Sequence, residues 1–307
     1  MYWSGVVIAA VLARFGDRQG KLVPIADDAL KVLILACDRH DELDMSLYAL
    51  GEAHLARSAH VVVSVDCIVP WKFYDMIRSH SSRFNTLKIQ SSYQQHVEPD
   101  AWKDERVARH WISAISRMFY DGAERVLYLE EDHVAMPDIF LAANRFDNAC
   151  PSCFAVNLAC HKPCGGMYTT DQASAGIGVI GNIAVVYYKS KWLDFIRRRH
   201  RFCSVRGDWD YNLKWLYQYR CLQVYKPRAY HLHDCRSART KRLEFNGKYC
   251  NKRRELYMQF RTEWSSTPSG VPRINMQRQV SEGIGQTATA PDRMRERCLE
   301  AAEHWSS

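Results

Sequence analysis

The sequence lacks the local motifs by which many nucleotide-binding and hydrolytic enzymes are recognised. It has no P-loop, no glycine fingerprint for dinucleotides, no Gly-x-Ser-x-Gly elbow and no set of kinase motifs. A long apolar run is also missing, because the uncharged residues 1–13 end at Arg14, well short of the ~20 residues that span a membrane. A signal peptide begins with a positively charged region, and this run has no basic residue at its start. We interpret residues 1–30 as an N-terminal segment, either a short hydrophobic stretch or the remnant of a membrane anchor.

The composition is that of an ordinary globular protein. Of 307 residues, 47% are apolar and 25% are charged, which excludes long disorder, collagen and coiled coil. The net charge of +8 suits an anionic ligand, but nucleic acid, a sugar nucleotide and an acidic membrane fit it equally well. Eleven cysteines indicate an oxidising compartment, and the odd number leaves at least one thiol unpaired.

Strands and helices alternate in the first half of the chain. Apolar runs typical of buried strands predict strands at residues 31–37, 60–66, 86–90 and 125–129. Helical spacing predicts helices at 41–57 and 107–120, and Pro137 opens another. The pattern predicts an α/β fold with a mostly parallel sheet flanked by helices, whose ligands bind beyond the carboxyl ends of the strands.

The second half is less regular. Residues 154–159 and 177–188 are typical of strands, and residues 189–199 and 208–219 of helices. From about residue 265 the chain is rich in small and polar residues. We expect loop or tail at 265–290 and a short helix at 291–303.

An acidic cluster directly follows the strand expected at 125–129. Glu130, Glu131 and Asp132 repel one another unless a cation compensates them, and His133 comes next. Hard cations such as Mn²⁺ or Mg²⁺ prefer oxygen ligands and need few from the protein when a diphosphate supplies others. The alternative is a solvated acidic turn before a helix, where carboxylates favour the helix dipole.

Two later segments could contribute to the same chemistry. Asp210, at the start of an expected helix and beside Trp209, could act as a general base against a sugar hydroxyl, although Asp208 indicates a simple helix cap. His231 and His233 alternate and would share one face of a strand. One of them could complete a cation site with Asp132, or both could be structural.

Two cysteine pairs invite a zinc interpretation. Cys150 and Cys153 are separated from Cys160 and Cys164 by a predicted strand of six residues. Such a strand spans about 20 Å, which keeps the pairs from sharing one tetrahedral ion. Local disulfides are the favoured interpretation.

Several spaced segments, taken in order, resemble one enzyme family. They are residues 126–133, 136–140, 202–203 with 209–210, and 227–231 with 234–235. Together they are similar to N-acetylglucosaminyltransferase II, which adds β-1,2-linked N-acetylglucosamine to the α-1,6 arm of the N-glycan core. The resemblance runs from about residue 31 to residue 300. It implies a GT-A fold, with a mostly parallel central sheet and a smaller mixed sheet in the second half.

The resemblance assigns roles to particular residues of this chain. It implies that Asp132 and His231 bind the metal, that Asp210 is the catalytic base, and that Trp209 and Asn182 contact the acceptor. The residues implied in donor binding are Leu35, Ala36, Cys37, Asp38, Arg39, Asp66, Arg106, Val107, Ala108, Arg109, His110, Glu130 and Glu131. It further implies disulfides Cys150–Cys153, Cys203–Cys298 and Cys235–Cys250. Cys37, Cys67, Cys160 and Cys164 stay unassigned, and Cys221 is not expected to pair in the family manner.

The function implied is an inverting, metal-dependent transfer from UDP-GlcNAc to the 2-hydroxyl of a mannose in an N-glycan. The cofactor is Mn²⁺, with Mg²⁺ as an alternative, and no nucleic-acid partner is expected. By resemblance the protein belongs in the Golgi lumen as a type II membrane protein, with its anchor at or before the start of this chain. A transferase with another donor or acceptor, a glycan-binding protein without catalysis and a metal-dependent hydrolase stay open.

The same resemblance predicts how the chain is divided. Residues 31–264 would form the catalytic domain, with a nucleotide-sugar half at 31–135 and an acceptor half at 136–264. Residues 265–307 would form a C-terminal tail tied back by Cys298.

Overall fold

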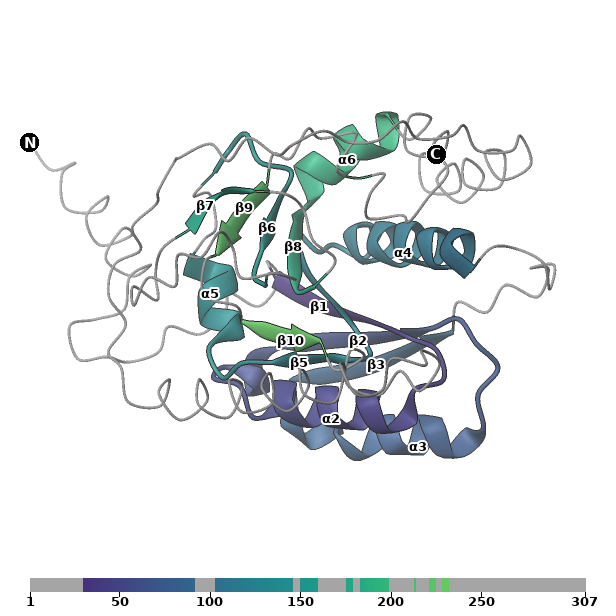
Figure 1. The fold of residues 1–307 in the computed structure, drawn as a ribbon. Helices are drawn as coiled ribbons and strands as arrows, with labels where there is room; N and C mark the ends of the chain where they lie inside the picture. Colours follow the sequence, from purple (N-terminus) through teal and green to yellow (C-terminus); the bar gives the residue numbers. More distant parts are fainter. Residues whose placement is uncertain are drawn as a thin grey trace, which may run out of the picture.

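The computed structural model describes residues 30–91, 103–145, 150–159, 175–178, 183–198, 213, 221–224 and 228–231. Within these residues, eight strands form one sheet in the order β3-β2-β1-β4-β8-β6-β9-β7, and β5 and β10 form a separate pair. Figure 1 shows the sheet running through the molecule with helices on both of its faces. The predicted α/β class, a mostly parallel sheet flanked by helices, is confirmed.

The first half of the chain forms the parallel part of the sheet. Its strands are β1 (Leu30–Ala36), β2 (His60–Val65), β3 (Thr86–Ser91) and β4 (Arg125–Glu130). Ala36 of β1 is in register with Val65 of β2, and Leu35 is in register with Glu130 of β4. The carboxyl ends of these three strands therefore lie side by side at one edge of the sheet.

The second half adds antiparallel pairing to the same sheet. Its strands are β6 (Ala155–Asn157), β7 (Ala175–Gly178), β8 (Val185–Tyr188) and β9 (Cys221–Val224). Strand β8 pairs antiparallel with both β4 and β6, β9 pairs parallel with β6, and β7 pairs antiparallel with β9. The two-stranded sheet joins β5 (His133–Ala135) to β10 (Ala229–His231).

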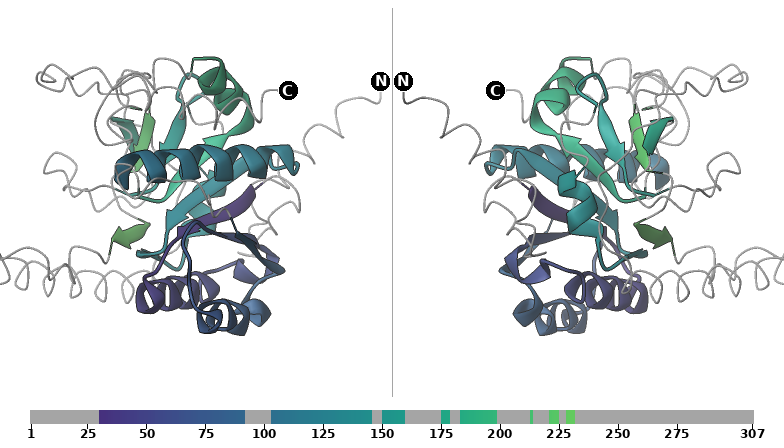
Figure 2. Two further views of the ribbon diagram at one scale, coloured as in Figure 1. Left: turned by 90° about the vertical axis from the view of Figure 1, so that its right-hand side faces the viewer. Right: turned by 90° about the vertical axis from the view of Figure 1, so that its left-hand side faces the viewer.

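Side chains of the buried strands point alternately to the two faces of the sheet and so divide the core into two layers. Val32 and Ile34 of β1 face helices α2 (His40–Gly51), α3 (Trp71–Ser79) and α5 (Ile139–Arg145). Leu33 and Leu35 face α4 (Lys103–Tyr120) and α6 (Lys189–Arg197). Figures 1 and 2 show α2 and α3 on one side of the parallel strands and α4 on the other. Burial on both faces explains why these strands are continuous apolar runs in the sequence.

An aromatic cluster fixes α4 and α6 on the second layer. The ring centroid of Trp111 lies 4.9 Å from that of Trp192 and 5.5 Å from that of Phe195, both in edge-on geometry. The indole nitrogen of Trp192 donates a hydrogen bond to Ser116 Oγ at 2.9 Å. Truncation of a buried aromatic side chain of this kind costs about 3–5 kcal/mol. The cluster therefore holds α4 firmly against the sheet.

Some predicted elements differ from the observed ones. The helix expected at 41–57 ends at Gly51, and a 3₁₀ turn follows at Ala56–Ser58. The helix that Pro137 was expected to open begins at Ile139. Of the strand expected at 177–188, the structure describes β7 and β8 at its two ends. Helix α3 and strands β5 and β9 were not predicted, because α3 buries only Phe73 and Ile77 and each strand has four residues or fewer.

Several predictions lie outside the described residues. They concern the N-terminal segment, the tail at 265–307 with its short helix and, apart from residue 213, the helix expected at 208–219. Among the described helices, none combines the length and the apolar character needed to cross a membrane.

Candidate functional site

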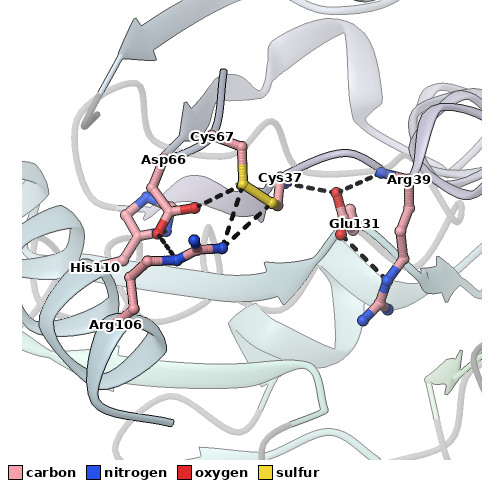
Figure 3. The surroundings of a disulfide bond; sticks show 7 residues. All are labelled: Cys37, Arg39, Asp66, Cys67, Arg106, His110 and Glu131. Carbon is pink, nitrogen blue, oxygen red and sulfur yellow. Dashed lines mark hydrogen bonds and ion pairs between the residues drawn. A yellow bond between two sulfur atoms is a disulfide. The ribbon is translucent and has the colours of Figure 1, made fainter. Parts of the chain in front are cut away.

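Three loops meet at the carboxyl edge of the parallel strands. Residues 37–39 follow β1, Asp66 and Cys67 follow β2, and Glu131 and Asp132 follow β4. Because β2, β1 and β4 are parallel neighbours, these loops adjoin one another, as the sequence predicted. Figure 3 shows Arg39 and Glu131 on one side of the central disulfide and Asp66, Arg106 and His110 on the other.

Asp132 is the centre of the first group. Its side chain is fully buried, and its Oδ2 lies 3.2 Å from Nε2 of His231. The small sheet makes this contact possible, because β10 pairs with β5 and sets His231 opposite His133. The two residues implied as metal ligands, far apart in the sequence, therefore touch in the structure.

His133 faces the same carboxylate but plays a different part. One ligand atom each from Asp132, His133 and His231 lies within 4.8 Å of the others, an arrangement compatible with a metal ion. However, the backbone N–H of Glu130 donates to Nδ1 of His133 at 2.8 Å, so the neutral ring carries its proton on Nε2. That N–H lies 3.9 Å from Oδ1 of Asp132. At that distance the two groups are not hydrogen-bonded. Because its Nε2 carries the proton, His133 is a poor metal ligand, and Asp132 and His231 are the better ligands.

Burial and neighbouring charges move the pKa values of the acidic cluster apart. Burial raises the pKa of Glu130 to about 7, and the charge of Asp132 adds to that rise. Burial likewise raises the pKa of Glu131 to about 7, against hydrogen bonds and the charge of Arg39. Burial alone would raise the pKa of Asp132, but the hydrogen bond with His231 and the positive charge of Arg39 hold it well below its usual range. Asp132 is therefore the member of the cluster that stays anionic.

The loop after β1 is fastened to the acidic cluster. Oε2 of Glu131 accepts hydrogen bonds from the backbone N–H groups of Cys37, at 2.7 Å, and Arg39, at 3.4 Å. The Arg39 guanidinium returns to the same turn, donating from Nη1 to Asp132 and placing Nε 3.4 Å from Glu131. Glu131 thus shapes the loop through its backbone, while Arg39 neutralises part of the cluster.

Asp66 is the centre of the second group. Its Oδ2 lies 3.6 Å from Nε of Arg106 and 3.6 Å from Nδ1 of His110, both on α4. Burial raises the pKa of Asp66, and Arg106 opposes that rise. Burial and the charge of Arg106 lower the pKa of His110 to about 3, so its ring is neutral and shares a 2.8 Å hydrogen bond with Ser64. This group offers a hydrogen-bonding carboxylate beside a guanidinium.

A disulfide between Cys37 and Cys67 ties the loops after β1 and β2 together, with a Cα–Cα distance of 4.9 Å. Nη2 of Arg106 lies 3.6 Å and 3.5 Å from the two sulfur atoms. The sequence analysis left both cysteines unassigned. Cys37 is the last residue of one predicted strand and Cys67 directly follows another, and those strands are neighbours, which is the signal that could have paired them.

The other donor-binding residues occupy different surroundings. Leu35 and Ala36 are the last residues of β1 and are buried, whereas Asp38 is exposed in the loop. On α4, Ala108 is buried and Val107 packs against the core, so their side chains serve the fold. The carboxylate of Glu130 accepts a 2.7 Å hydrogen bond from the hydroxyl of Tyr128.

The remaining site and cysteine predictions divide in two. Cys150 and Cys153 form the expected local disulfide, and Cys221, which was not expected to pair in the family manner, is buried and has no disulfide partner among the described residues. Asn182, Trp209 and Asp210 lie outside the described residues. So do His233 and the cysteines at positions 160, 164, 203, 235, 250 and 298.

A divalent cation fits the Asp132 group on chemical grounds. Among the described residues, Oδ1 of this buried carboxylate has no hydrogen-bond partner, which is costly unless a ligand satisfies it. A carboxylate and an imidazole form a donor set that transition-metal ions such as Mn²⁺ accept, and exogenous oxygen atoms would complete the shell.

Arg228 anchors the strand that carries His231 and was not predicted. It precedes β10, is 2% exposed, and places Nε 2.9 Å from Oδ2 of Asp138. Its backbone N–H donates to Leu158 O at 2.6 Å, and its carbonyl accepts from Met136 N at 2.8 Å. These contacts fix the start of the strand that carries His231. Arg228 belongs to the motif at 227–231, but nothing in that motif revealed its distant partner.

No protein-family model matches the chain, and no curated protein matches it significantly. Among solved structures, it is similar to S. aureus TarS 1–349 in complex with UDP-GlcNAc, at 12% identity and a TM-score of 0.42, over 65% of this chain and 58% of that one. It is similar to the glycosyltransferase GlyE of Streptococcus pneumoniae TIGR4, at 13% identity and a TM-score of 0.40, over 90% of this chain and 60% of GlyE. The mannosyltransferase PcManGT from Pyrobaculum calidifontis, in complex with GDP-Man and Mn²⁺, matches at 11% identity and a TM-score of 0.43, over 94% of this chain and 78% of its own. The chain thus covers less than two thirds of the first two proteins, and TM-scores below 0.5 assign no function.

Proposed function

We propose that this protein transfers a sugar from a nucleotide-sugar donor in a metal-dependent reaction, on a GT-A fold. One observation carries the proposal: the buried anionic carboxylate of Asp132 meets His231 at the ligand-binding edge of a parallel sheet. A cation site alone would suit many enzymes. Here it adjoins the loop that Glu131 holds and a second carboxylate at Asp66, so a diphosphate would meet the cation and a nucleoside would meet Asp66.

The described residues have distinct parts in donor binding. Asp132 and His231 would hold Mn²⁺, which when bound would offset the negative charge that develops on the departing nucleoside diphosphate. Asp66 would accept hydrogen bonds from the nucleoside, and Arg106 would supply positive charge beside it. Glu131 would keep the loop after β1 in the conformation that receives the donor.

The finer proposal is transfer of N-acetylglucosamine from UDP-GlcNAc to a mannose 2-hydroxyl on the α-1,6 arm of an N-glycan. In the transfer, the mannose oxygen forms a bond to the anomeric carbon, and the bond from that carbon to the diphosphate oxygen breaks, leaving its electron pair on UDP. The hydroxyl proton passes to the carboxylate of Asp210. Direct displacement inverts the anomeric configuration. Trp209 and Asn182 would contact the acceptor.

A transfer assay tests this proposal. The full chain is incubated with UDP-GlcNAc and a mannose-terminated N-glycan, with and without Mn²⁺, and the product linkage is determined. We expect a β-1,2-linked product that depends on the cation. Asp210→Asn should abolish transfer and leave UDP binding intact, whereas Asp132→Asn should weaken Mn²⁺ binding. Normal turnover by Asp210→Asn would overturn its role as the base.

The same assay separates the alternatives. A panel of UDP- and GDP-sugars identifies a different donor, and glycan binding without turnover would indicate a binding protein. Release of UDP without acceptor would favour a hydrolase. We also propose the Golgi lumen as the location, and the disulfides Cys37–Cys67 and Cys150–Cys153 support an oxidising compartment of that kind.

A further inference from the structure

Arg39 covers the carboxylate at which the proposed function places a cation. Its Nη1 donates to Oδ2 of Asp132, and its Nε lies 3.4 Å from Oε1 of Glu131. The same Oδ2 is 3.2 Å from Nε2 of His231. A guanidinium and an imidazole therefore occupy Oδ2, the oxygen that faces His231 and that a cation bound by both residues would share, whereas Oδ1 has no hydrogen-bond partner among the described residues.

Arg39 and a divalent cation cannot share this position. The Asp132 side chain is fully buried, so little water screens two positive groups that approach the same carboxylate. Binding of the cation to Oδ2 therefore requires the guanidinium to leave. In the form described here, Arg39 stands where the cation would bind.

The guanidinium has the freedom to move. Arg39 lies in the loop between β1 and α2, and its side chain is 29% exposed. The loop backbone is held independently of this side chain, because Glu131 accepts the N–H group of Cys37 and the disulfide secures Cys37 to Cys67. A planar guanidinium also binds diphosphate oxygens in a bidentate manner, better than a lysine ammonium does. The side chain can therefore exchange a carboxylate for a phosphate without unfolding its loop.

We propose that Arg39 is a nucleotide-operated gate on the metal site. Without nucleotide, its guanidinium neutralises Asp132 and lowers the affinity for the divalent cation. An incoming nucleoside diphosphate draws the guanidinium away and opens the carboxylate, so the cation binds after or together with the nucleotide. The inference rests on the proposed function, since it assumes that Asp132 and His231 bind a metal ion.

Mn²⁺ binding measured without catalysis tests the gate. Free Mn²⁺ is followed by electron paramagnetic resonance as it is titrated into the full chain, with and without UDP, for the wild type, Arg39→Gln and Arg39→Lys. Arg78→Gln is the matched control, because Arg78 pairs with Asp75 on α3, is exposed, and loses the same charge when substituted. UDP binding is measured in parallel by calorimetry, so that the coupling between the two ligands is obtained for each variant.

Without UDP, we expect Arg39→Gln to bind Mn²⁺ about tenfold more tightly than the wild type, the factor that corresponds to loss of one competing charge-assisted hydrogen bond. The gain in Mn²⁺ affinity caused by UDP should shrink in that variant. Arg39→Lys should resemble the wild type more closely, and Arg78→Gln should match it. Equal or weaker Mn²⁺ binding by Arg39→Gln overturns the gate while leaving the metal site intact. Absence of Mn²⁺ binding in every form, including with UDP, overturns the metal site itself and the gate with it.

Discussion

Asp66 and Asp132 are two carboxylates at the same edge of the same sheet, yet their surroundings give them opposite properties. Burial raises the pKa of Asp66 more than Arg106 lowers it, whereas the hydrogen bond with His231 and the charge of Arg39 outweigh burial at Asp132 and lower its pKa. The anionic form is therefore favoured at Asp132, which suits a cation, and disfavoured by burial at Asp66, which suits hydrogen bonds with an uncharged nucleoside. The ends of the parallel strands bring both carboxylates to the same edge of the sheet. Neighbouring residues from other elements then determine the pKa of each carboxylate.

Replacement of each carboxylate by an amide is the strongest test of whether Asp66 and Asp132 have different functions. Asp132→Asn should reduce the transfer rate by about a thousandfold, because it removes the charge that holds the metal. Asp66→Asn should instead weaken donor binding by about tenfold through loss of one hydrogen bond to a charged group. Steady-state kinetics with the donor varied separates an effect on kcat from an effect on KM.

Circular dichroism and thermal melting test whether both variants keep the fold. If the two substitutions change kcat and KM in the same proportions, Asp66 and Asp132 do not have separate functions.

A second test removes the ion pair that holds the start of β10, the strand that carries His231. Arg228→Ala should destabilise the protein by about 3 kcal/mol, because it removes the buried guanidinium that pairs with Asp138, whose other positive neighbour is Arg145. Chemical denaturation measures the loss. Arg78→Ala is the matched control, and since its pair with Asp75 is exposed it should cost less than about 1 kcal/mol. Equal losses in the two variants would show that the Arg228 pair does not anchor β10.

A third test concerns the disulfide beside Asp66, whose contribution to stability can be compared with that of the second disulfide. Replacing Cys37 and Cys67 by alanine should cost about 3 kcal/mol, because this bond restricts a segment of 30 residues in the unfolded chain. The same change at Cys150 and Cys153, only three residues apart, should cost less. Denaturation of the two double variants without reductant compares them. A larger loss from the short bridge would contradict this explanation.

The sequence was sufficient for elements that contact the core along their whole length. Strands β1, β2 and β4 are buried on both faces, so their apolar runs show in the sequence. Helix α4 was predicted because Trp111, Ile112, Ile115 and Met118 recur at helical spacing. Helix α3 and strands β5 and β9 depend on partners distant in the chain, and no local pattern announces such partners.

At the site, the sequence predicted residues whose side-chain chemistry is itself distinctive. It missed roles that depend on contacts formed only in the folded structure. The acidic cluster and His231 were found, since carboxylates after a buried strand and a histidine in a matching motif are local signals. The tautomer of His133, which makes it a poor ligand, depends on a hydrogen bond from the backbone of Glu130, and the anchoring role of Arg228 depends on Asp138. Those roles follow only from the folded geometry.

The smallest expected effect concerns His110, the buried neighbour of Asp66. Burial and the charge of Arg106 lower its pKa to about 3 in the folded protein, whereas the unfolded chain takes up that proton near pH 6.5. As the pH falls below 6.5, the unfolded state gains a proton that the folded state does not, so the stability contributed by this group is lost at up to about 1.4 kcal/mol per pH unit. Glu130 and Glu131, with raised pKa values, act in the opposite direction between pH 7 and 4.5.

The variant His110→Gln isolates this contribution, because glutamine cannot take up the proton but retains an amide for Ser64. Chemical denaturation of both proteins at pH 7.5 and pH 5 gives the difference in stability at each pH. From pH 7.5 to pH 5, the wild type should lose about 2 kcal/mol relative to the variant. Parallel pH dependence in the two proteins would mean that the His110 ring is protonated in the folded state. The Asp66 side would then carry a second cation beside Arg106, and its electrostatic contrast with the Asp132 side would largely disappear.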